Sequence, residues 1–165
     1  MTKLEAVMLT KRANNRLKIV GDTCYHLTRS KPSPENYKQL KSVLARIDRE
    51  LKSKDVFREE LTEAVTIFCD AYKQGENEEN LRVLSSKVYE AVRNVQHQRW
   101  ISVKKKHGKV SHYFNRFGQV RKHYRQRFYL KYEPERLKND NEYAKNIIPY
   151  IPILVVAGLV YWLFS

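Results

Sequence analysis

Catalytic motifs are missing from this sequence. It contains no glycine-rich phosphate loop, no His-Glu-x-x-His pair and no nucleophile elbow, and it has only five glycines in 165 residues. Four of the five histidines, His97, His107, His112 and His123, lie among lysines and arginines with no carboxylates close to them in sequence. Metal sites need clustered acidic, thiolate or imidazole ligands, so this pattern argues against one. We therefore expect a protein that is not an enzyme and that uses no cofactor.

Cysteine is also scarce. The two cysteines, Cys24 and Cys69, do not form a Cys-x-x-Cys pair, which argues against a structural zinc site. Both fall among apolar residues at helical spacing, a position typical of buried free thiols in a reducing compartment. The N-terminal residues lack an apolar run and include Glu5, so neither a signal peptide nor a transit peptide is expected.

Strict alternation of apolar and polar residues is absent, so no β-strands are predicted. Apolar residues recur instead at the spacing of helix faces. These faces comprise Leu4, Val7 and Met8; Ala13, Leu17, Val20, Cys24 and Leu27; Leu40, Val43, Leu44, Ile47 and Leu51; Phe57, Leu61, Ala64, Val65, Phe68, Cys69 and Tyr72; and Leu81, Leu84, Val88, Val92 and Val95. Ser33 and Pro34 predict the start of one helix, and Gly75 predicts the end of the next. Because the connections are short, the pattern predicts an all-α antiparallel helical bundle.

Acidic residues are missing from residues 93–132, which contain twelve lysines or arginines and no aspartate or glutamate. Residues 1–92 hold 17 basic and 14 acidic side chains, so most of the net charge of +14 belongs to one segment. We expect residues 1–92 to form a near-neutral helical bundle and residues 93–137 to complete the domain as a basic, aromatic-rich helical segment. Residues 138–146 are polar and predict a linker.

Charge is absent from the apolar run at residues 147–164. As a helix this run spans roughly 27 Å, close to the ~30 Å hydrocarbon core of a bilayer. Pro149 and Pro152 lie in its first turns, where proline is tolerated. A buried core helix is the alternative. We predict a single C-terminal transmembrane helix, or tail anchor, whose apolar residues include Ile147, Ile153, Leu154, Val155, Val156, Leu159, Val160, Leu163 and Phe164.

The basic segment predicts a surface that faces anionic phospholipid headgroups. Its cations are Lys104, Lys105, Lys106, Lys109, Arg121, Lys122, Arg125 and Arg127. Interleaved aromatic residues are expected to contact the apolar edge of the headgroups, namely Phe114, Phe117, Phe128 and Tyr129. The alternative is a solvated face with the aromatics packed inward, and RNA phosphates would suit the same charge.

The run "HGKVSHYFNRF", residues 107–117, resembles the tumour necrosis factor α-induced protein 8 family. Members carry a His-Gly-basic-aliphatic run followed by phenylalanines, which match His107, Gly108, Lys109, Val110, Phe114 and Phe117. The upstream runs "EAVTIFCDAY" and "VLSSKVYEAVRNVQHQ" are similar to the family's preceding helices, so the resemblance extends over residues 35–118. It implies a helical cylinder around an apolar cavity that binds phospholipids or fatty acyl chains and influences cell death and inflammation. The short N-terminus and the predicted anchor depart from that family.

The run "RLKIVGDTC", residues 16–24, resembles the third homology motif of the B-cell lymphoma 2 family, and "QRWI", residues 98–101, resembles the second. A C-terminal mitochondrial anchor is typical of that family, whereas its Asn-Trp-Gly-Arg signature is absent here. The resemblance implies a helical bundle that acts through partner proteins at a membrane.

Three functions are compatible with the sequence. The first is a tail-anchored, non-enzymatic helical bundle at a membrane surface that regulates cell death through lipid or protein binding. The second is a single-span accessory subunit of a large mitochondrial membrane complex, such as the respiratory chain or ATP synthase. The third is a membrane-tethered RNA-binding protein. The span and its basic neighbours suit the mitochondrial outer membrane with the domain in the cytosol; the inner membrane and the endoplasmic reticulum are alternatives.

Overall fold

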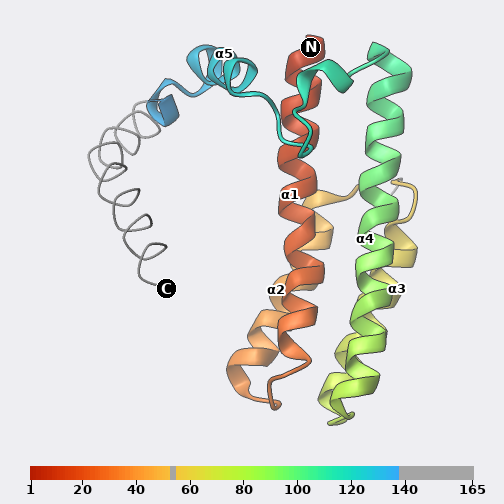
Figure 1. Cartoon of the computed structure of the whole chain (residues 1–165). Coiled ribbons are helices and arrows are strands. Elements are labelled where there is room, and N and C mark those ends of the chain that lie inside the picture. Colours follow the sequence, from red (N-terminus) through yellow and green to blue (C-terminus); the bar gives the residue numbers. More distant parts are fainter. Residues whose placement is uncertain (53–54, 138–165) are drawn as a thin grey trace, which may run out of the picture. The chain divides into compact units, whose positions relative to one another are not determined.

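The computed structural model describes residues 1–52 and 55–137, which belong to two compact units, one over Met1–Val110 and one that begins at Ser111. The first unit contains four helices, α1 (Lys3–Leu27), α2 (Pro34–Glu50), α3 (Arg58–Lys73) and α4 (Glu78–His107). Successive helices run antiparallel, and α1 lies beside α4 with α2 and α3 behind them (Figure 1). The all-α prediction is confirmed, since the described residues contain no strand and only an isolated bridge between Phe114 and Val120.

Helix ends are set by local side chains. Ser33 Oγ accepts a hydrogen bond from the backbone N–H of Asn36 at 3.2 Å, and Pro34 occupies the first helical position of α2, as predicted. Gly75 follows the end of α3 with a φ of +75°, and its N–H donates to the carbonyl of Tyr72. Glycine adopts this left-handed conformation without the clash that a Cβ would cause, so the predicted end of α3 is also confirmed.

The core of the first unit is built from the predicted apolar faces of all four helices. Its largest fully buried side chains include Tyr72, Phe68 and Leu17. Both cysteines lie in this core as free thiols, as predicted. Their burial raises the pKa of the Cys24 thiol well above its usual range and that of Cys69 to about 11, so both are neutral at pH 7.

One predicted core position is wrong, and a second lies against the core but is only partly buried. Phe57 does not lie on the inner face of α3: it is the residue before the helix, has a φ of +66° and is 37% exposed. Leu44 is only half-buried, because it lines an open groove of about 650 Å³ between α2 and α3 together with Tyr37 and Cys69. Of the neighbouring helix pairs in this unit, α2 and α3 are the least closely packed, which leaves the outer edge of the α2 face uncovered.

A glycine sets the close approach of α1 to α4. A Cβ added to Gly21 would lie 2.9 Å from Cδ1 and Cε1 of the Tyr89 ring, which is closer than side chains tolerate. The Tyr89 hydroxyl donates to Asp22 Oδ1 at 2.5 Å. Burial of the ring, followed by this hydrogen bond to a carboxylate, raises the pKa of Tyr89 to about 12. The ring is therefore fixed at its tip as well as packed against the α1 backbone.

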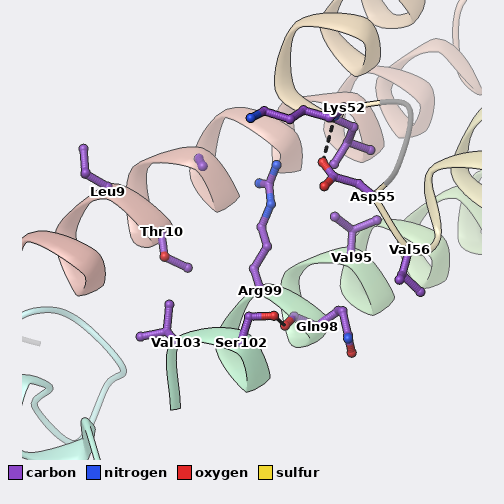
Figure 2. Close-up of a pocket in the computed structure, with 12 residues that line it drawn as sticks. Leu9, Thr10, Lys52, Asp55, Val56, Val95, Gln98, Arg99, Ser102 and Val103 are labelled. Carbon is purple, nitrogen blue, oxygen red and sulfur yellow. Dashed lines mark hydrogen bonds between the residues drawn. The ribbon is translucent and has the colours of Figure 1, made fainter. Parts of the chain in front are cut away.

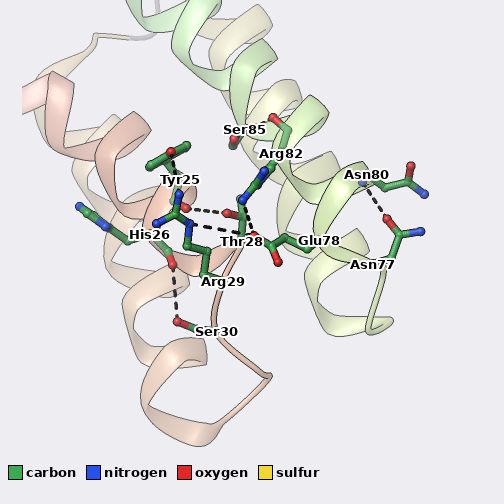
Figure 3. A network of polar contacts seen from close by, with 10 residues as sticks. All are labelled: Tyr25, His26, Thr28, Arg29, Ser30, Asn77, Glu78, Asn80, Arg82 and Ser85. Atoms are coloured by element: carbon green, nitrogen blue, oxygen red, sulfur yellow. Dashed lines mark hydrogen bonds and ion pairs between the residues drawn. The ribbon is translucent and has the colours of Figure 1, made fainter.

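An ion pair joins the residues that follow α1 to the start of α4, and a second pair lies within α4 (Figure 3). Glu78 accepts from Arg82 at 2.7 Å and lies 4.0 Å from Arg29. All three side chains are more than half exposed, so each pair contributes at most about 1 kcal/mol to stability.

A buried tyrosine joins the α1–α2 connection to α3. The Tyr72 hydroxyl donates to the carbonyl of Lys31 and accepts from the side-chain amide of Asn36, both at 2.9 Å. The amide of Asn36 also donates to the Lys31 carbonyl at 2.9 Å. These three bonds satisfy the polar groups that the connection brings against the core.

The second unit contains a short 3-10 helix, η1 (Ser111–Tyr113), and α5 (Lys122–Tyr132). A turn joins them, in which the backbone N–H of Asn115 donates to the Gln119 carbonyl at 2.8 Å and Gly118 has a φ of +69°. The basic segment is therefore α-helical up to His107 and again from Lys122, with η1 and a turn between them.

No helix within residues 1–52 and 55–137 is long and apolar enough to cross a membrane. The predicted linker at 138–146 and the predicted anchor at 147–164 lie outside the described residues.

Candidate functional site

The eight cations of the predicted lipid-facing surface fall into two groups. We call Lys104, Lys105, Lys106 and Lys109 the α4-end cations, because the first three occupy the last turn of α4 and the fourth follows it. We call Arg121, Lys122, Arg125 and Arg127 the α5 cations. All eight residues are exposed. The α4-end cations belong to the first unit and the α5 cations to the second.

The α4-end cations surround the end of a helix. Consecutive helical residues are about 100° apart around the axis, so Lys104, Lys105 and Lys106 point to three different sides. The partial negative charge at a helix C-terminus favours lysine in the last turn. Within the described part of the chain, none of these lysines forms an ion pair with a carboxylate. Their charge is therefore available to an external anion.

The α5 cations do not share one face. Lys122 and Arg125 are three residues apart and lie on the same side of α5, whereas Arg127 projects away from Arg125. A planar anionic surface would therefore contact one pair directly. Arg127, on the opposite side, would stand up to about 10 Å further away, one Debye length at 0.1 M salt, where its contribution is strongly reduced. Arg121 precedes the helix, and its Nε–H donates to the Phe114 carbonyl at 3.0 Å.

The aromatic residues of the segment divide between surface and interior. Phe117 is 71% exposed, and the guanidinium carbon of Arg116 lies 4.7 Å from its ring centroid. Phe114 and Tyr129 are half-buried. Phe128 is 4% exposed, so the expectation that it contacts headgroups is wrong. Phe128 is the inward residue of α5, and Phe117 is the aromatic residue of this set that is exposed.

Sequence reasoning missed a buried polar cluster in the first unit. Asn14 is only 5% exposed although it lies on α1 among core residues. Its backbone carbonyl accepts from Gln96 Nε2 at 3.0 Å, and its Oδ1 accepts from Arg99 at 3.3 Å. Arg99 also donates to the backbone carbonyl of Glu50, the last residue of α2, at 2.5 Å. An asparagine on an apolar helix face predicts that its side chain has hydrogen-bond partners in the core, but the sequence does not identify those partners.

The Arg99 guanidinium is half-buried, and its burial lowers the pKa of the group. The carboxylates of Glu50 and Asp55 act in the opposite direction. Neither carboxylate is within ion-pair distance of Arg99 in the described chain, and that of Glu50 is engaged by Arg16 at 2.6 Å. Arg99 thus donates to two neutral oxygens and has no direct counter-ion of its own.

Nucleophilic and metal-binding groups are not brought together in the described residues. No set of three histidine, cysteine, aspartate or glutamate side chains is clustered within residues 1–52 and 55–137. The thiols of Cys24 and Cys69 are buried with raised pKa values, the opposite of the low pKa that activates a cysteine.

No protein-family model, curated protein or solved structure matches this chain.

Proposed function

We propose that this protein acts without catalysis at a membrane surface, where its basic segment binds anionic phospholipid headgroups. The observation that supports this most directly is the set of exposed cations at the end of α4 and on α5, which have no carboxylate partner in the described chain. The apolar run at residues 147–164 is proposed as the anchor that keeps these cations near the bilayer.

The strength of this binding follows from geometry. Each lysine or arginine near an anionic leaflet contributes about 1 kcal/mol. Because the α4-end cations surround a helix end, about two of the four face a plane at once, which corresponds to about 2 kcal/mol or roughly a thirtyfold effect on binding. The resemblances add a proposed role in the control of cell death through this membrane contact.

Vesicle flotation tests the proposal. Residues 1–137, shown first to be helical and to unfold cooperatively, should bind vesicles that contain phosphatidylserine and should not bind vesicles of phosphatidylcholine alone. Changing all four α4-end cations to alanine should weaken binding about thirtyfold, for the reason given above. The matched control changes four exposed lysines elsewhere, Lys31, Lys38, Lys41 and Lys87, and so removes the same charge. Equal weakening of vesicle binding by both variants would show that net charge alone accounts for the binding. That result would refute a defined lipid-binding surface.

RNA binding is the second candidate, because Phe117 exposes its ring beside Arg116 in a strongly basic unit. Exposed aromatic rings in basic grooves stack on single-stranded bases. Changing Phe117 to alanine should weaken RNA binding and leave vesicle binding less affected, since a lipid surface does not require stacking. Tight binding of single-stranded RNA by a protein that fails to float would replace the lipid proposal with this one.

Assembly into a large complex is tested separately. Blue-native electrophoresis of gently solubilised membranes separates a free or dimeric protein from an accessory subunit of a respiratory or ATP-synthase complex. Migration with a complex of that size would favour the accessory-subunit function over a free-standing regulator.

A further inference from the structure

A pocket of about 830 Å³ lies in the first unit where the α2–α3 connection meets α1 and α4 (Figure 2). It exists because the helices differ in length. α1 and α4 have 25 and 30 residues, whereas α2 and α3 have 17 and 16. The ends of the longer pair therefore extend past the shorter pair, and side chains that face inward there have no helix opposite them.

The walls of the pocket are mainly apolar. Leu9 and Ala13 contribute from α1, Val95 and Val103 from α4, and Val56 from the connection. Leu9 is 48% exposed and Val56 is 58% exposed, so the chain leaves apolar surface open at the pocket. Ligand pockets are commonly of this size and character, with apolar walls and a few polar groups that orient the ligand.

One cation enters this apolar space. The Arg99 side chain reaches from α4 toward the connection near Lys52 and Asp55 (Figure 2). An arginine carries five N–H donors, and Arg99 uses its two terminal nitrogens for the bonds to Asn14 and Glu50. Its Nε–H has no partner among the described residues.

Among the described residues, the charges around Arg99 do not cancel. The charged groups that act on it or line the pocket beside it are Arg16, Lys52, Glu50 and Asp55. Together with Arg99, these described groups comprise three cations and two carboxylates, an excess of one positive charge. Glu50 pairs with Arg16 at 2.6 Å, and Asp55 Oδ2 accepts from the backbone N–H of Lys52 at 2.8 Å, so neither carboxylate is paired with Arg99 in the described chain. A single negative charge on a bound ligand would balance the remaining positive charge.

We infer that this pocket binds a small monocarboxylate with an apolar body. The carboxylate would accept hydrogen bonds from Arg99, whose planar guanidinium matches carboxylate geometry better than a lysine does. The apolar body would cover Leu9, Val56 and Val103. This site is independent of the proposed lipid-binding cations, which do not line the pocket.

Arg99 also has a structural role, because its bond to the Glu50 carbonyl caps the end of α2. Arg58 provides a matched control for that role. It donates to the carbonyl of Leu51 at 3.2 Å and to Asp48 at 2.7 Å, so it caps the same helix end without lining the pocket. If Arg99→Met acts only by destabilising the helix end, Arg58→Met should therefore have the same effect. A loss of ligand binding that depends on Arg99 itself should not occur in Arg58→Met.

The test is a fluorine NMR titration of the full chain in a non-ionic detergent, with detergent alone as the blank. The probe is para-fluorobenzoate, and para-fluorobenzyl alcohol is its uncharged match. We expect saturable line broadening with the acid and at least about tenfold weaker binding of the alcohol, because hydrogen bonds to charged groups are lost. Arg99→Met should weaken binding of the acid to the level of the alcohol, and Arg58→Met should leave it unchanged.

A second variant keeps the test decisive if Arg99→Met fails to fold. Val103→Trp fills the pocket from a half-buried position and leaves every bond of Arg99 in place, so it should abolish binding of both probes. The inference is overturned if the wild-type chain does not bind the acid, if acid and alcohol bind equally, or if a folded Arg99→Met or Val103→Trp variant binds the acid as the wild type does.

Discussion

Replacing Gly21 with alanine is the sharpest test of how α1 packs on α4. In an exposed helix this change is stabilising by about 1 kcal/mol, because alanine restricts the unfolded chain and favours the helix. At Gly21 the new Cβ would lie 2.9 Å from two carbons of the Tyr89 ring. The ring cannot move aside freely, because its hydroxyl is hydrogen-bonded to Asp22 and its edge meets Tyr25 with ring centroids 6.4 Å apart.

The expected magnitude follows from these two opposing terms. Overpacking a well-packed site costs about 1–3 kcal/mol, from which the helix-propensity gain of about 1 kcal/mol is subtracted. We therefore expect Gly21→Ala to destabilise the protein by up to about 2 kcal/mol. In a Tyr89→Ala background the clash is absent, and the same change should become stabilising by about 1 kcal/mol.

Urea unfolding of residues 1–137, followed by circular dichroism, measures all four corners of this double-mutant cycle. Gly75→Ala is the matched control. It also replaces glycine by alanine at a cost, but the cause is a φ of +75° with no atom within 4 Å of the added Cβ, so Tyr89→Ala should not relieve it. A stabilising Gly21→Ala in the wild-type protein, or a cost that persists without the Tyr89 ring, would refute the packing argument.

Three further predictions concern stability. Phe68→Ala, at a fully buried site, should cost about 3–5 kcal/mol, whereas Leu44→Ala, at a half-buried one, should cost less than about 2 kcal/mol; equal shifts in the urea midpoint would contradict the open α2–α3 groove. The pKa of Cys69 is raised from 9.0 to about 11, so the native state favours the neutral thiol. The contribution of this thiol to the free energy of unfolding is complete below pH 9 and is lost as pH rises through 11. Unfolding free energies across this range should fall less steeply for Cys69→Ala, and an unchanged slope would argue against the shift. Phe57→Asn should stabilise the protein by up to about 1 kcal/mol, because asparagine tolerates a positive φ; a lower melting temperature would show that the exposed ring contributes more than the strain costs.

Local features of the helices were readable from the sequence because they depend on neighbours a few residues apart. The apolar faces repeat at i, i+3 and i+4, and the described chain buries most of their members. Ser33, Pro34 and Gly75 act on their own helix ends, so their roles needed no knowledge of the fold. The separation of a near-neutral region from a basic one is likewise a property of order along the chain.

The tertiary structure decided everything that depends on helix lengths and distant partners. Asn14 and Arg99 are 85 residues apart, and Arg99 is 49 residues from the Glu50 carbonyl, so no local pattern pairs them. Leu44 fits its helical face as well as its neighbours do, and it is half-exposed only because α3 packs loosely on α2. The pocket at Arg99 arises where the longer helices α1 and α4 extend beyond the ends of the shorter helices α2 and α3. Periodicity specifies which side of a helix is apolar, whereas the packing of other helices against that side determines which of its residues are covered.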